Sequence, residues 1–186
     1  MGRVFAMSKV LAIDTSTSRS CVAIIENSQV LYIGFRDGAT AHGPSLPALV
    51  QEALAVSDVD EVVVGMGPGP FTGLRVGIAF AQSFALAREI PVRGVCSLDA
   101  IAAQVQNSDF IITVDARRKE VYWARYTNAV RVGQPAVNFP ADVSGAPIYP
   151  DLFPDMVSLV NLAGNITEPI YLRRPDAVAT ADRLLK

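Results

Sequence analysis

The sequence has 186 residues, 51% of them apolar, and a formal net charge of −2 at pH 7. This length and composition suffice for one large domain or two small lobes with a compact core. The small negative charge and the lack of any Lys/Arg block argue against a protein that binds nucleic acid by itself. No apolar run reaches the ~18 residues of a membrane span, and Cys21 and Cys96 stand far apart, as buried cytosolic thiols do. We therefore expect a cytoplasmic protein without a membrane segment. Met7 offers a second start, so residues 1–6 are left out of the predicted fold, and whether they are native stays open.

The first half of the chain reads as strands followed by alternating helices and strands. Three short β-rich runs at residues 10–13, 21–25 and 30–34 are separated by polar turns, which predicts a three-stranded meander. A helix is predicted from Ser45, a candidate N-cap, to about residue 57. A strand at 61–65, a helix at 71–88, a strand at 91–96 and a helix opening at Ser97 complete the order βββαβαβα. This order fits a mixed sheet with helices on its faces.

The strand pattern starts again at Phe110. The run FIITVDARRKEVYWARY repeats the strand, Asp, polar turn and strand of LAIDTSTSRSCVAII, which places Asp14 and Asp115 at equivalent positions. We predict an N-terminal lobe at 8–106 and a C-terminal lobe at 107–186, with both carboxylates near the cleft between them. From Ala129 onward turn residues stand where helices would be needed, so the second lobe is predicted to be reduced.

A glycine-rich loop, GMGPGPFTGLRVG, joins the predicted strand at 61–65 to the helix at 71–88. It has neither the P-loop nor the dinucleotide-loop spacing. Gly65, Gly67 and Gly69 could still hold an anion at the helix N-terminus, or they could simply make a tight turn. Asp14 with Thr15 and Ser16 has the same two interpretations: a hairpin for metal and phosphate, or an Asx turn. Weak binding of ATP, ADP or Mg²⁺ is left open.

The predicted helix at 71–88 is apolar on every side. Its Gly73, Gly77, Ala81 and Ala85 recur every four residues and form a ridge that a second helix can approach closely. The cover is either a helix of another chain or the protein's own first helix; the outward-facing ridge is our working hypothesis.

The lone histidine, His42, rules out the paired-histidine motifs of zinc proteases, so no metal site is predicted. We expect His42 in a solvated loop, because no Gly-x-Ser-x-Gly motif offers it a nucleophile.

Four segments together resemble the TsaB (YeaZ) family, bacterial proteins that assist threonylcarbamoyladenosine formation on tRNA: LAIDTSTSRSCVAI, GMGPGPFTGLRVGIAFAQSFA, VDARRKEVYWARY and PIYLRRPDA. The resemblance implies a two-lobed α/β fold of the actin, Hsp70 and sugar-kinase (ASKHA) type, with a duplicated mixed sheet. It also implies an inactive relative of the catalytic subunit TsaD, whose metal-binding histidines it lacks. Such a protein has no catalytic residues and is required for transfer to adenosine 37 of tRNAs that read codons beginning with A.

The resemblance further implies the partners and the surfaces. The partners are a TsaD-like subunit and a TsaE-like ATPase, with a homodimer when the protein is alone and tRNA reached only through the complex. The implied partner or dimer interface comprises Phe71, Thr72, Gly73, Leu74, Gly77, Phe80, Ala81 and Phe84. The implied relic of a nucleotide site comprises Asp14, Thr15, Ser16, Gly67, Gly69 and Asp115.

Two other functions compete with this one. An ATP-dependent phosphotransferase or ATPase of the same fold needs a glycine pair in the second lobe, and VSGAP supplies one glycine of such a pair. A glycoprotease-type peptidase ranks last, because this chain lacks the histidines that such an enzyme would need.

Overall fold

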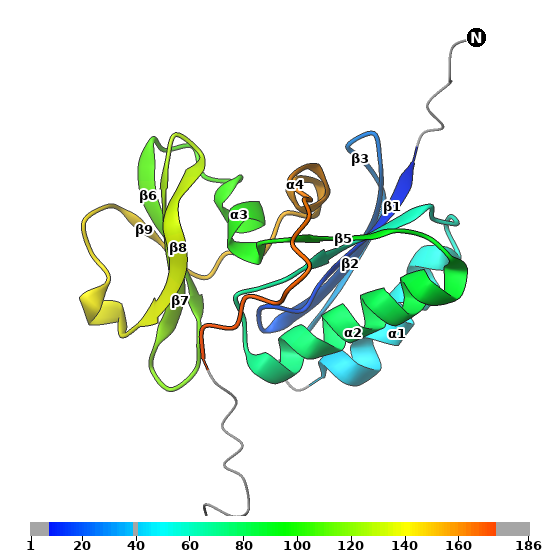
Figure 1. The fold of residues 1–186 in the computed structure, drawn as a ribbon, viewed down its shortest axis with the longest axis horizontal. Coiled ribbons are helices and arrows are strands. Elements are labelled where there is room, and N and C mark those ends of the chain that lie inside the picture. The colour runs from blue at the N-terminus through cyan, green and yellow to red at the C-terminus, as the bar shows by residue number, and fades with distance from the viewer. Residues whose placement is uncertain (1–7, 39–40, 174–186) are drawn as a thin grey trace, which may run out of the picture.

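The protein is described here by a computed structural model that covers residues 8–38 and 41–173. Its strands form two separate sheets, one from each half of the chain (Figure 1). The larger sheet has the order β3-β2-β1-β4-β5. Its strands are β1 (Lys9–Asp14), β2 (Arg19–Glu26), β3 (Gln29–Asp37), β4 (Glu61–Gly65) and β5 (Val92–Val95). The first three pair antiparallel, whereas β4 and β5 run parallel to β1, so the predicted meander and mixed sheet are confirmed.

Helices cover both faces of the larger sheet. The long helices α1 (His42–Leu54) and α2 (Phe71–Arg88) lie on one face, and the short helix α4 (Met156–Asn161) lies on the other (Figure 1). On the α1 and α2 side, Leu11, Ile24 and Val62 are fully buried in one core cluster. On the α4 side, alternate strand residues such as Ala12 and Val63 pack with Met156 and Leu159. The period-two alternation of the strands thus supplies two apolar faces at once.

The smaller sheet has the order β8-β7-β6-β9. Its strands are β6 (Asp109–Asp115), β7 (Val121–Thr127), β8 (Val130–Asn138) and the two-residue β9 (Ile148–Tyr149). Helix α3 (Ser97–Ala102) packs on β6 and β7 through Leu98 and Ile101 and joins the third core cluster. Between β8 and β9 the described chain has only a single 3₁₀ turn, Pro140–Asp142, which fits the predicted reduction of the second lobe.

Helix α1 and strand β8 differ from the sequence prediction. Helix α1 begins at His42, three residues before the predicted cap Ser45, because the His42 side chain is held by a hydrogen bond to β2. Strand β8 continues through GQPAVN, where turn residues argued against regular structure. A register shift between Trp123 and Arg125, opposite Gly133 at φ 78°, accommodates the irregularity, and Pro135 is tolerated because β8 is an edge strand.

The last described segment returns from the first sheet to the second. Gly94 in β5 bridges Asn165, and the Ile170 N–H donates to the carbonyl of Met66 at 2.8 Å. The Arg173 guanidinium then reaches the carbonyl of Ala116, just after β6. The predicted division at residues 106 and 107 falls between the two sheets along the chain, and α4, which follows that division, packs on the first sheet. No helix in the described part of the chain has the length and apolar character needed to cross a bilayer.

Candidate functional site

The predicted phosphate hairpin is built around Asp14, the last residue of β1. Its carboxylate is 1% exposed. Oδ1 accepts hydrogen bonds from the Ser16 N–H at 2.8 Å and the Ser16 hydroxyl at 2.7 Å, and Oδ2 accepts from the Ser97 hydroxyl at 2.6 Å. Burial raises the pKa of Asp14, although these hydrogen bonds pull it down. The Asx-turn interpretation describes this geometry, because the carboxylate serves its own chain.

The glycine loop lies directly on this hairpin. A Cβ at Gly65 would overlap Asp14 Oδ2, and a Cβ at Gly69 would overlap the carbonyl oxygen of Ser16. Gly67, at φ 89°, adopts a backbone conformation that favours glycine. The glycines therefore allow close approach of two backbone segments. This packing leaves Asp14 no open position for a Mg²⁺ ion, so the residues do not fit the metal and nucleotide chemistry of active ASKHA enzymes.

Asp115 is separate from this group. Its side chain is more than half exposed, and it accepts a hydrogen bond from the Arg117 N–H at 2.9 Å. It borders a hollow of about 70 Å³ that Thr17, Ser18 and Phe153 also line. That volume is far below the roughly 300–1,000 Å³ of small-molecule sites. The structure thus brings five of the six predicted site residues together. Asp115 lies apart from them at the small hollow, and Asp14, which was predicted near a cleft, is buried.

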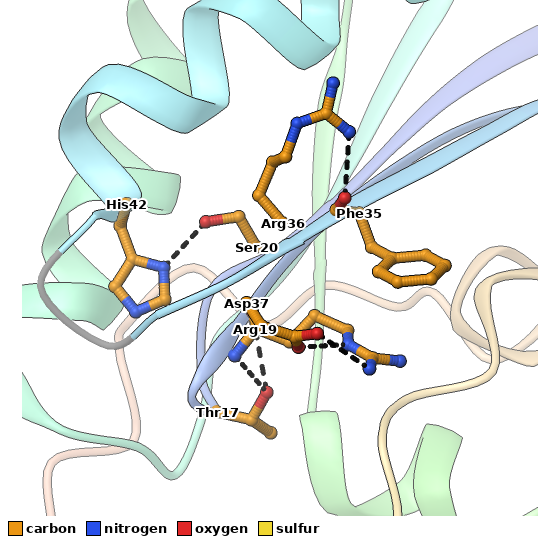
Figure 2. Close-up of polar contacts among 7 residues, drawn as sticks. All are labelled: Thr17, Arg19, Ser20, Phe35, Arg36, Asp37 and His42. Carbon is orange, nitrogen blue, oxygen red and sulfur yellow. Dashed lines mark hydrogen bonds and ion pairs between the residues drawn. The ribbon is translucent and has the colours of Figure 1, made fainter.

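Figure 2 shows the polar contacts at the neighbouring end of β2 and β3. Ser20 and His42 Nδ1 share a hydrogen bond of 2.7 Å, and both side chains are buried. The expectation of a solvated loop histidine is therefore wrong; burial lowers the pKa of His42 and favours its neutral form. Arg19 pairs with Asp37 at 2.8 Å, and its guanidinium lies 4.2 Å from the ring centroid of Phe35 and 3.9 Å from that of Phe153. This contact ties the segment before α4 to the first sheet.

The small-residue ridge of α2 faces inward. Gly73, Gly77, Ala81 and Ala85 are all buried. The Thr15 hydroxyl donates to the Gly73 carbonyl at 2.8 Å and accepts from the Gly77 N–H at 3.1 Å. A Cβ on Gly73 would crowd the His42 ring. The outward-facing ridge is thus corrected: close packing on the chain's own hairpin and first helix requires the small residues.

The predicted interface residues divide accordingly. Gly73, Leu74, Gly77 and Ala81 lie inside the lobe, whereas Phe71, Thr72, Phe80 and Phe84 reach the surface. The outer face of α2 consists of exposed residues at helical spacing: Thr72, Arg75, Ala79, Ser83 and Leu86. Leu86 is 81% exposed, and Ala79 and Ser83 beside it are small.

The sequence analysis missed Ser97 and Ser20. A usable signal existed for Ser97, because it follows β5, and β1, β4 and β5 are parallel strands whose carboxyl ends meet at one sheet edge. Ser20 had no such signal, since its partner His42 was assigned to a loop.

The two mixed sheets and their helices define a class: an α/β protein of the ASKHA type. In this protein the hairpin after β1 is closed around the buried Asp14. The chain matches the sequence model described as "TsaD: tRNA N6-adenosine threonylcarbamoyltransferase" over residues 36–171. The chain belongs to this family, in its TsaB (YeaZ) branch.

Relatives of known sequence support the assignment. A protein of Mycobacterium tuberculosis, named as uncharacterized, is 44% identical, and the alignment covers 95% of this chain and 97% of that protein. The "tRNA threonylcarbamoyladenosine biosynthesis protein TsaB" of Escherichia coli is 35% identical over 63% of this chain and 54% of its own length. The Bacillus subtilis protein of the same name is 33% identical over the same shares. These alignments thus span little more than half of the two TsaB proteins.

Solved structures agree on the fold. YeaZ from Pseudomonas aeruginosa superposes with a TM-score of 0.71 at 26% identity, covering 84% of this chain and 90% of that one. A protein described as similar to the peptidase YeaZ from Pseudomonas aeruginosa gives 0.75 at 26% identity over 90% and 100% of the two chains. The ethanolamine utilization protein EutJ from Carboxydothermus hydrogenoformans gives 0.50 at 11% identity over 72% and 53%, a likeness of fold alone.

Proposed function

We propose that this chain is a non-catalytic component of tRNA threonylcarbamoyladenosine biosynthesis in the cytoplasm. In this role it binds a TsaD-like catalytic subunit and a TsaE-like ATPase, forms a homodimer when alone, and meets tRNA through the complex. The observation that carries the proposal is the closed hairpin: Asp14 is buried and accepts three hydrogen bonds from Ser16 and Ser97, and Gly69 packs on the backbone of Ser16. Lobes at 8–106 and 107–186 remain part of the proposal.

Peptidase chemistry finds little support in the described residues. Ser20 is 1% exposed, so a peptide carbonyl has no path to its hydroxyl beside His42. Burial raises the pKa of Cys21 to about 12 and that of Cys96 to about 11, which disfavours the nucleophilic thiolate form. Within residues 8–38 and 41–173, no three His, Cys, Asp or Glu side chains gather in a way that could hold a metal ion.

The functional test is depletion of the protein in its host. Threonylcarbamoyladenosine in bulk tRNA, measured by nucleoside mass spectrometry, should fall, and re-expression of the Asp14→Asn variant should restore it because no chemistry is assigned to Asp14. Unchanged nucleoside levels after full depletion would overturn the proposed function. Restoration by wild type but failure of a stably folded Asp14→Asn protein would favour the ATP-dependent alternative.

The partner surface is assigned to the outer face of α2. Leu86→Glu places a charge at its most exposed apolar residue, and association with a TsaD-like subunit should weaken by about tenfold or more, since desolvating an unpaired charge opposes binding. Val130→Glu on β8, 68% exposed, is the matched control and should bind normally. Sedimentation of the mixed proteins measures the complex. If both variants bind the TsaD-like subunit equally well, the outer face of α2 is not the partner surface.

A further inference from the structure

Strand β3 is an open edge of the larger sheet (Figure 1). The other sheet edges that the described residues form are protected. The Gly164 N–H donates to the Gly94 carbonyl of β5 at 3.0 Å, β8 contains Pro135, and β9 has only two residues. Strand β3 has nine residues, neither proline nor lysine, and regular pairing with β2 from residue 32 to residue 37. A long, regular edge of this kind is a template for a further strand.

One side of β3 is apolar and uncovered. Ile33 lies opposite Ala23 and Phe35 lies opposite Cys21, and both of these β2 residues belong to the core under α4. Helix α4 packs on β1, β2 and β4. Beyond it, Ile33 is 55% exposed and Phe35 is 50% exposed. A strand added to β3 would continue this side of the sheet and cover both residues with apolar side chains of its own.

The other side of β3 is polar and charged. Figure 2 shows Phe35 and Arg36 leaving the strand on different sides. The Arg36 guanidinium donates to Glu52 Oε1 at 2.8 Å, and the Tyr32 hydroxyl donates to Glu52 Oε2 at 2.8 Å. The Arg36 and Glu52 side chains are each about half exposed, so this ion pair is open to a second one.

Strand β3 is complementary to itself. In antiparallel pairing about a twofold axis at Gly34, residues equally far from the axis lie opposite each other. Ile33 then faces Phe35 of the second copy, so apolar side chains meet on the α4 side of both copies. Tyr32 faces Arg36 of the second copy. Because Tyr32 is bonded to Glu52, that arginine reaches the Glu52 carboxylate, and arginine and glutamate alternate around the axis.

We propose that β3 pairs with β3 of a second copy of this chain, which joins the two larger sheets into one continuous sheet. The inference rests on the homodimer of the proposed function and assigns the surface that forms it. The outer face of α2 belongs to a different element and stays open to the TsaD-like subunit. Binding of that subunit therefore does not require the dimer to dissociate.

Sedimentation of the full chain measures the dimer. Wild type should be dimeric at about 100 µM, well above a Kd of ~10 µM. Ile33→Lys should weaken dimerisation at least tenfold, because it places a charge on the apolar side of the edge. Val130→Lys on the protected β8 edge, at a residue that is 68% exposed, is the matched control and should dimerise like wild type. A monomeric wild type at this concentration, or equal dimerisation by the two variants, would overturn the proposal.

Charge reversal tests the pairing of Arg36 with Glu52 across the axis. Arg36→Glu leaves two carboxylates side by side on each copy, and Glu52→Arg leaves two cations, so each variant alone should dimerise at least tenfold more weakly than wild type. Mixed together, the two variants should form a heterodimer at least as tight as the wild-type dimer, because opposite charges then face each other. An ion pair that acts only within one chain cannot produce this rescue. If the two variants are folded by circular dichroism and the mixture stays monomeric, the proposed pairing is wrong.

Failure of this inference is distinguishable from failure of the proposed function. A dimer that survives Ile33→Lys and is lost in Leu86→Glu would keep the homodimer but overturn β3 as its surface. The Ile33→Lys monomer should still capture the TsaD-like subunit as wild type does, because α2 is unchanged. Loss of capture by this variant, if it is folded, would contradict the separation of the two surfaces.

Discussion

The carboxylate of Asp14 has a structural role, because it holds the hairpin after β1 and the start of α3 together. Three hydrogen bonds hold its two oxygens, and a glycine at position 65 is required beside it because any Cβ would overlap the carboxylate. Burial nevertheless disfavours its charged form, so the folded protein binds a proton at Asp14 more readily than the unfolded chain does.

Asp14→Asn should therefore change the pH dependence of stability. A pKa raised in the folded state contributes stability that is complete below the unfolded value of about 3.9 and is lost as the pH rises. The amide has no such dependence and can still accept from Ser16 and donate to Ser97. The unfolding free energy of Asp14→Asn relative to wild type should rise as the pH increases above the unfolded value, as urea titrations at several pH values would measure.

Asp37→Asn serves as the opposite control. Its hydrogen bond from Arg19 lowers the pKa of the exposed Asp37, so wild type should gain relative to this variant as the pH rises through the unfolded pKa. The same slope for both variants would contradict the assigned state of Asp14.

Part of this site could be predicted from the residues alone. An Asp followed by Thr and Ser after a strand is typical of an Asx turn, and that alternative matches the contacts found. Ser97 lies 83 positions from Asp14, and only the order of the parallel strands brings the two together. His42 failed as a prediction because a lone histidine among Gly, Pro and Ser carries no periodic signal of burial.

Among the elements, α2 was predicted with the bounds that the structure gives, 71–88, yet with the wrong face outward. Its apolar residues point in all directions, so periodicity gave no orientation. The deciding contacts are long-range: Thr15, from the β1–β2 hairpin, bonds both Gly73 and Gly77. Glycine is needed at positions 73 and 77 because the hairpin contacts the helix backbone there.

A double-mutant cycle on this contact measures the packing. Gly77→Ala should cost about 1–3 kcal/mol, because its Cβ would overlap the Thr15 hydroxyl. Thr15→Ala should cost a similar amount, because it removes the two hydrogen bonds between the Thr15 hydroxyl and the helix backbone at Gly73 and Gly77. Combined, the two should cost less than their sum by about 1 kcal/mol or more, since the overlap no longer exists.

Gly43→Ala in α1 is the control for this cycle. A Cβ there meets no atom within 4 Å, and the helical position should become more stable by roughly 0.5–1 kcal/mol. Urea denaturation gives all four values. Additive costs at Thr15 and Gly77 would contradict the direct contact between the hairpin and the small-residue ridge of α2.

For the whole molecule, the repeat of strand, Asp and hairpin predicted the two sheets. The antiparallel pairs β1–β2 and β6–β7 occupy equivalent places, and Asp14 and Asp115 end equivalent strands. The sequence could not predict β9, which has two residues, or the return of α4 to the first sheet. Both depend on contacts between distant segments, and neither is long enough to show a period.

Charge predicts how the isolated chain meets RNA. With a net charge of −2, it should bind tRNA weakly, through the three cations of the turn Arg117, Arg118 and Lys119. The logarithm of the binding constant should fall against that of the salt concentration with a slope of about −2 to −3, the value for three phosphate contacts. Fluorescence anisotropy at several salt concentrations measures this slope, and Arg117→Gln should reduce its magnitude by about 1. Tight binding that survives high salt would contradict the expectation.

The backbone crosses between the two sheets three times in the described residues: from β5 through α3 to β6, from β9 to α4, and from α4 to Arg173 beside Ala116. In mechanical terms these crossings connect the two sheets in parallel. The stacking of Arg19 on Phe153 adds a further connection. Opening one sheet from the other must stretch all of them together. The two sheets are therefore braced against each other, and the surface that spans them should keep a fixed geometry.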